Sequence, residues 1–134
     1  MSRTRTRNRS SLAVNVALLA LLVLAAVVST ACAPTLPSEP PGITGVVTQL
    51  AAGDGRPASI TVEGTTQPAG ALSDKAAITI PPTALFFDGQ GNAASLGAIA
   101  HIAKGTKVRV WFNGPVAESY PVQGSAEAVQ ILGN

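Results

Sequence analysis

The chain has 134 residues, of which 46% are hydrophobic and 12% charged, and this length suits one domain of ordinary size. Its single cysteine excludes an intrachain disulfide. The formal net charge of +2 depends on four arginines among the first nine residues; without them, five basic side chains stand against seven acidic ones, a net charge of −2. Nucleic-acid binding depends on basic side chains that neutralise phosphates, so we expect no nucleic-acid partner.

The first 31 residues have the three parts of a secretory signal. The four arginines lie in a segment without acidic residues, and an apolar run follows from Leu12 to Val28. Three small residues, 29–31, then lead directly to Cys32. A basic segment, an apolar segment and a small-residue cleavage site in this order are typical of an export signal. We therefore expect residues 1–31 to be a cleaved signal peptide.

Residues 29–32, Ser-Thr-Ala-Cys, resemble the lipobox of bacterial lipoproteins, with Ser29 where Leu or Val is usual. The resemblance implies that a diacylglyceryl group is attached to the Cys32 thiol and that Cys32 becomes the acylated first residue. Two acyl chains are enough for stable anchoring. We expect the extracytoplasmic face of the cell membrane as the location and the lipid bilayer as a partner. An uncleaved membrane anchor and a secretion signal with an incidental cysteine are the alternatives.

A proline-rich segment follows the cysteine. Residues 32–41 contain Pro34, Pro37, Pro40 and Pro41. Prolines at this density favour the extended polyproline II conformation, at about 3.1 Å per residue. We therefore expect a semi-rigid tether of roughly 25–30 Å between the membrane and a domain at residues 42–134. A disordered tail without a spacing role is the alternative.

The predicted domain consists of short segments that are rich in β-branched residues or alternate between polar and apolar. Such segments between turn residues are typical of strands. Asp54-Gly55 has the turn chemistry of a tight hairpin between the first two of them. The expected extended segments are residues 43–50, 59–63, 75–80 with a continuation at 83–88 after two prolines, 107–112 and 127–132.

One short helix is expected between the third and fourth strands. Ser95 is a suitable N-cap, and Leu96, Ile99 and Ile102 share one face at helical spacing. Gly105 is expected to end the helix in the left-handed conformation. Three strands, a helix and two strands form the order of a mostly all-β, five-stranded OB-like barrel. An SH3-like barrel or a small open sheet would have a similar order.

Residues 114–123, Gly-Pro-Val-Ala-Glu-Ser-Tyr-Pro-Val-Gln, resemble the signature of the YobA-like bacterial lipoproteins, a domain family of unknown function. The Asp74-Lys75 pair before the third strand and the turn at residues 103–108 are also similar to this family. The resemblance extends over nearly all of residues 42–134. It implies a small secreted or lipid-anchored β-barrel and no particular reaction.

Two interpretations of the 114–123 segment remain open. In the first, Tyr120 packs its ring on the core and directs its hydroxyl to a backbone group, and the segment is scaffold. In the second, the connection between the last two strands is a recognition surface, as loops on barrels commonly are. The candidate binding residues are Trp111, Glu118, Ser119, Tyr120 and Gln123.

Two pairs of adjacent aromatic residues, Phe86-Phe87 and Trp111-Phe112, lie on expected strands. Neighbouring residues of a strand face opposite sides, so we expect at least one member of each pair in the core.

No residue pattern predicts catalysis. His101 is the only histidine and lies in the expected helix, and Ser119 has no evident base. The acidic residues show no metal-ligand spacing, so we expect no catalytic residue, no metal and no cofactor. We therefore predict a non-enzymatic module that binds an envelope protein or another envelope component. A barrel that binds a glycan or small molecule through Trp111 and Tyr120, and an enzyme with an unrecognised site, are the alternatives.

Overall fold

The computed structural model describes residues 15–16, 32–64 and 74–133. The expected signal peptide, apart from residues 15 and 16, and residues 65–73, between the second and third expected strands, lie outside these residues. Ala33–Asn134 forms one compact unit and Met1–Cys32 another. Within the described ranges, no helix is long and apolar enough to cross a membrane.

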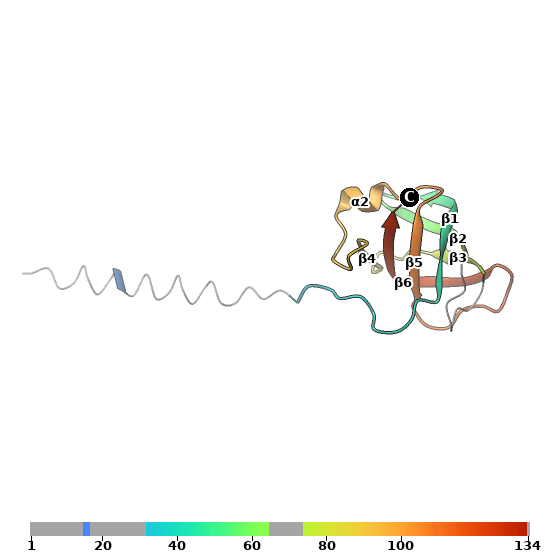
Figure 1. The fold of residues 1–134 in the computed structure, drawn as a ribbon, viewed down its shortest axis with the longest axis horizontal. Coiled ribbons are helices and arrows are strands. Elements are labelled where there is room, and N and C mark those ends of the chain that lie inside the picture. The colour runs from blue at the N-terminus through green and yellow to red at the C-terminus, as the bar shows by residue number, and fades with distance from the viewer. Residues whose placement is uncertain (1–14, 17–31, 65–73, 134) are drawn as a thin grey trace, which may run out of the picture. The chain divides into compact units, whose positions relative to one another are not determined.

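The described residues form six strands and one short helix (Figure 1). All the predicted extended segments are present. The segment expected at 83–88 is shorter than expected, and the last strand begins five residues earlier. The elements are β1 (Ile43–Ala52), β2 (Pro57–Gly64), β3 (Lys75–Thr79), β4 (Leu85–Phe87), α2 (Leu96–Ala100), β5 (Lys107–Phe112) and β6 (Val122–Gly133).

Five of these strands close into a barrel in the order β1, β2, β3, β6, β5 and back to β1. The pairs are antiparallel except β3–β6, which is parallel. This is the closed, five-stranded OB-like barrel that the order of elements predicted. β4 lies outside the closed ring and pairs in parallel with β6.

The barrel closes because β6 is long enough to pair with two strands in succession. Residues 122–125 pair with β3, and residues 126–133 pair with β5, so one strand joins both edges of the sheet. A register shift between Trp111 and Phe112 lies opposite the point where β6 changes partner. Such irregularities bend a strand and increase its twist, as closure of a small barrel requires.

The predicted hairpin and helix cap are confirmed, but the predicted helix end is wrong. In the β1–β2 turn, the amide of Gly53 donates to the Arg56 carbonyl at 2.9 Å, and Gly55 has a φ of +72°. The Ser95 hydroxyl caps α2 by accepting from the Ala98 amide at 3.2 Å. Gly105 does have a positive φ, of +96°, but it lies in the turn before β5, well beyond the end of α2.

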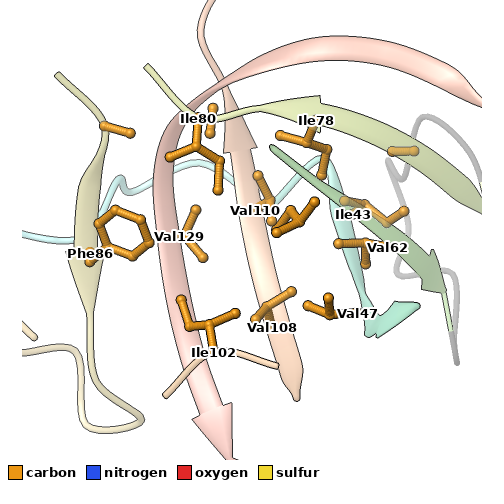
Figure 2. Packing of buried hydrophobic residues seen from close by; sticks show 14 of the residues in the cluster. Ile43, Val47, Val62, Ile78, Ile80, Phe86, Ile102, Val108, Val110 and Val129 are labelled. Carbon is orange, nitrogen blue, oxygen red and sulfur yellow. The ribbon is translucent and has the colours of Figure 1, made fainter. Parts of the chain in front are cut away.

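The main core fills the barrel with side chains from every strand and from the α2 region, and Figure 2 shows them converging on one interior. Ile99 and Ile102 are buried in it as expected, whereas Leu96 is 81% exposed. Ile102 follows the end of α2, so the chain after the helix still covers the core. The core residues labelled in Figure 2 are Ile43, Val47, Val62, Ile78, Ile80, Phe86, Ile102, Val108, Val110 and Val129.

A second, smaller cluster lies on the other side of β4, β5 and β6. It consists of Phe87, Trp111 and Ala128, with Leu36 packed against it. Phe86 belongs to the main core, which confirms that adjacent aromatic residues of this strand face opposite sides. The outward member is nevertheless buried too, because a further segment of the chain covers it.

Candidate functional site

The Tyr120 side chain is 73% exposed, so its ring does not pack on the core as the first of the two interpretations required. Hydrogen bonds among the residues next to Tyr120 hold the connection between β5 and β6 in place. The Ser119 hydroxyl donates to the Pro121 carbonyl at 2.9 Å and accepts from the Gln123 amide group at 3.3 Å. The amide of Ala117 also donates to the Gln123 carbonyl, at 2.8 Å. The segment thus forms a hydrogen-bonded loop that presents Tyr120 to solvent.

A groove of about 550 Å³ crosses the outer surface of β2, β3 and the first part of β6. Side chains alternate between the two faces of a strand, so residues on either side of the inward Ile60 and Ile78 point outward. We call this depression the hydroxyl groove, because most of its outward side chains carry hydroxyl groups. Its outward residues are Ser59, Thr61, Ala77, Thr79, Gln123 and Ser125.

None of the described residues that line the hydroxyl groove is charged. The charges nearest to it along β2 and β3 are paired with each other, since the Lys75 ammonium lies 2.7 Å from the Glu63 carboxylate. The hydrogen bond that Lys75 donates to that carboxylate, together with the negative charge of Glu63, raises the pKa of Lys75 above its ordinary value. Tyr120 shares a smaller depression with this ion pair. The face therefore combines neutral hydrogen-bonding groups with one exposed aromatic ring.

The structure separates Trp111 from the other predicted binding residues. Ser119, Tyr120 and Gln123 lie in or beside the hydroxyl groove, and Glu118 is exposed on the same loop. The Trp111 side chain is only 7% exposed, and it lines a different depression.

The proline-rich segment covers Trp111. The indole Nε1–H donates to the Glu39 carbonyl at 2.7 Å, and Leu36 packs against the same cluster. The second half of the predicted tether therefore lies against the barrel. We call residues 36–41 the docked segment.

The residues that resemble catalytic groups make local contacts. His101 is exposed, and its Nδ1 lies 2.6 Å from the Gly97 carbonyl oxygen one turn earlier. Ser119 is bonded within its own loop, as described above. Among residues 15–16, 32–64 and 74–133, no three His, Cys, Asp or Glu side chains gather where they would hold a metal ion.

Sequence reasoning missed the hydroxyl groove. Thr61 and Thr79 alternate with buried residues of β2 and β3, and this alternation is visible in the sequence. What the sequence did not show is that β3 pairs with β6, which places Ser125 beside them. Because that pairing joins strands far apart in the chain, periodicity alone did not reveal a continuous polar surface.

Residues 62–133 match the model of DUF3221, a family of proteins of unknown function. This match covers more than half of the chain, and the chain belongs to this family. It begins within β2 and includes the residues of β3 and β6 that line the hydroxyl groove, whereas the β2 residues of the groove, 59–61, lie outside it. No curated protein and no solved structure matches the chain.

Proposed function

We infer that this DUF3221 protein is a lipoprotein of the YobA-like type, anchored through acylated Cys32 at the extracytoplasmic face of the cell membrane. Support comes from the signal-like first 31 residues and the lipobox-like residues 29–32. Cys32 is a free and exposed thiol at the expected cleavage point. The barrel is then a non-enzymatic module that binds a component of the cell envelope.

The observation that carries the binding role is the hydroxyl groove with Tyr120 beside it. Its volume of about 550 Å³ is within the range of ordinary ligand sites. The outer surface of strands 2 and 3 is also where OB folds bind oligonucleotides and oligosaccharides. An acidic domain outside the cytoplasm is poorly suited to nucleic acid, which leaves envelope proteins and glycans as the partners.

A glycan is the second, more specific candidate, and the lining of the groove favours it. Ser59, Thr61, Thr79 and Ser125 offer hydroxyl groups that both donate and accept. A neutral sugar chain needs such groups and has no charge for a lysine or carboxylate to pair with. An exposed Tyr120 ring is a suitable surface for the apolar face of a sugar ring.

The anchoring is tested by replacing Cys32 with Ser in the full chain. Cells are grown with an alkyne analogue of palmitate, and membrane and soluble fractions are compared. The parent is expected to carry the label and remain with the membrane after a salt wash, and Cys32→Ser is expected to lose the label. A labelled Cys32→Ser protein would overturn acylation at this residue.

The binding role is tested by cross-linked capture from native membranes with the full-length protein. Tyr120→Ala and Thr61→Lys, which places a charge in the groove, are compared with the parent. Leu96→Ala is the matched control, because Leu96 is highly exposed and lies outside the groove. A partner or glycan that the parent and control retain and both groove variants lose supports the proposal. Capture of the same set by all four proteins would overturn it.

A glycan is distinguished from a protein by isothermal titration of the purified protein with neutral envelope polysaccharide fragments. Trp111 fluorescence is a poor reporter here, since its side chain lies under the docked segment. We expect heat of binding from the parent and a loss with Thr61→Lys. No heat with any fragment, together with captured protein, would leave the protein partner as the function.

A further inference from the structure

The docked segment and Gly42, the residue that follows it, contact the barrel at three successive points. The Leu36 side chain is half-buried against Phe87, Trp111 and Ala128. Three residues later, the Glu39 carbonyl accepts the bond from the Trp111 indole at 2.7 Å. The Gly42 amide then donates to the Val110 carbonyl at 2.9 Å, where β1 begins. Side-chain packing, a side-chain hydrogen bond and a backbone hydrogen bond thus fasten one stretch of chain.

The receiving surface is shaped for Leu36. A Cβ atom on Gly91 would lie 2.8 Å from Leu36 Cδ1, so the side chain lies against a position where any other residue would force it to move. Gly91 has a φ of +85°, which also favours glycine. The fit therefore depends on a bare backbone at this turn.

The turn that carries Gly91 is held rigidly. One carboxylate oxygen of Asp88 accepts from the amides of Gln90 and Asn92, both at 2.9 Å. These bonds, chiefly the one from the Asn92 amide, lower the pKa of Asp88 below its ordinary value. The rim of the docking surface thus keeps its shape.

A buried glutamine joins this turn to the barrel. Gln130 of β6 is 4% exposed, and its amide group donates to the carbonyls of Asp88 and Gly89 at 3.2 and 3.4 Å. Its oxygen accepts from the Arg109 guanidinium at 3.3 Å. Because a buried amide is costly unless all its bonds are made, this arrangement favours one position of the turn on the barrel.

Phe87 and Trp111 point outward from the ring and would form an apolar patch if nothing covered them. The Phe87 side chain is fully buried in the folded unit. Removing such large apolar side chains from water is favourable. This gain favours the docked conformation over the free polyproline tether that the sequence predicted.

We propose that this docking holds the barrel directly against the membrane and fixes which side of it faces the bilayer. The proposal rests on the proposed acylation of Cys32. Leu36 is four residues beyond Cys32, and four extended residues span at most about 14 Å. This maximum distance from Cys32 to Leu36 is about half the length expected for the whole tether. The side of the barrel with β4 and Trp111 is therefore the membrane-proximal side.

Trp111 is the only tryptophan of the chain, so its fluorescence reports on the docked segment. The acylated protein is placed in phosphatidylcholine vesicles that contain a dansyl-labelled phosphatidylethanolamine. Emission wavelength and acrylamide quenching measure the cover over Trp111, and energy transfer to dansyl measures its proximity to the headgroups. Leu36→Ser removes the packing, and Leu96→Ser is the matched control on an exposed leucine.

A further variant carries ten Gly and Ser residues between Ala33 and Pro34. It adds roughly 17 Å of root-mean-square reach while leaving the docked segment intact. We expect Leu36→Ser to shift the emission to the red and to increase quenching, and the control to match the parent. We expect the insertion to keep the parent emission and to lose energy transfer.

Two results would overturn the proposal. Parent-like emission and quenching in Leu36→Ser would show that the segment is not docked. Parent-like energy transfer in the insertion variant would show that the docked segment does not set the distance from the membrane. The emission of Leu36→Ser and of the control is also compared on a Cys32→Ser background in detergent. This comparison tests docking without any lipid anchor, so a failure of the proposed anchoring is distinguished from a failure of docking.

Discussion

The two outer faces of this barrel share β6 but have opposite character. Along the second half of β6, the face with Phe87 and Trp111 carries large apolar side chains, and the docked segment covers it. Along the first half, the face with Thr61 and Thr79 carries small polar side chains, and the part of the chain that the structure describes leaves it open as the hydroxyl groove. The same closed ring thus has one face that belongs to its own chain and one that is available to a partner.

The difference follows from the cost of covering each kind of surface. Removing apolar area from water is favourable at about 25 cal/mol per Å². Covering hydroxyl groups is unfavourable unless the cover supplies matching hydrogen bonds. A proline-rich segment has few backbone donors to offer, so it is suited to the apolar face and poorly suited to the groove.

The largest expected effect is on the covered face. Phe87→Ala removes a fully buried side chain, and we expect it to lower the free energy of unfolding by about 3–5 kcal/mol. Thr79→Ala in the groove is expected to change it by less than about 0.5 kcal/mol. Urea denaturation followed by circular dichroism compares the two. Equal losses would contradict the distinction between a covered and an open face.

Two glycines with positive φ, one at the edge of the docking surface and one away from it, test the contact with Leu36. Gly91→Ala and Gly55→Ala are each expected to cost about 1–2 kcal/mol, because both place a Cβ in the left-handed region. Only the Cβ at position 91 meets Leu36; the one at 55 meets nothing within 4 Å. We therefore expect a red shift of Trp111 emission in Gly91→Ala alone. A shift in both variants, or in neither, would contradict the role of Leu36.

The turn with Asp88, at the edge of the docking surface, also predicts that stability depends on pH. Because folding lowers the pKa of Asp88, the carboxylate stabilises the fold above its unfolded pKa of about 3.9, and this contribution is lost as the pH falls through the lower native value. Asp88→Asn is expected to be less stable than the parent at pH 7 and equally stable near pH 2. The measurement is thermal denaturation at both pH values. An equal difference in stability between the parent and Asp88→Asn at both pH values would mean that the shape of the side chain, not its charge, accounts for the effect.

The smallest effect on stability is expected at the open face. Tyr120→Ala removes a ring that is 73% exposed, so the free energy of unfolding should change by less than about 0.5 kcal/mol. The same variant is expected to lose partner capture. Thermal denaturation beside the capture experiment tests both statements. A large loss of stability would assign Tyr120 to the scaffold.

Local patterns were sufficient for most of the elements. Alternation at residues 59–63 and 107–112 predicted β2 and β5, and Asp54-Gly55 predicted the hairpin. Ser95 predicted the start of α2. These features depend on residues a few positions apart, for which side-chain period and turn chemistry are direct evidence. The strand order that follows from them predicted an OB-like barrel, but an SH3-like barrel or a small open sheet would have had a similar order.

The candidate site was only partly predictable. Ser119, Tyr120 and Gln123 do lie together at the edge of the groove, as their shared loop suggested. Trp111 does not join them, although it precedes the loop by only a few residues. Alternation indicated that Trp111 and Phe112 face different sides, but not what lies against either side.

By itself, the sequence determined the signal-like first 31 residues, the β-strands, the capped helix and their order, because each depends on local composition and spacing. Only the tertiary structure decided which outer face is covered. The indole of Trp111 and the carbonyl of Glu39 are 72 positions apart, and β6 meets β3 and β5 through pairings of long range. Periodicity tells which residues share a face, whereas closure of the ring and burial of apolar area decide what that face meets.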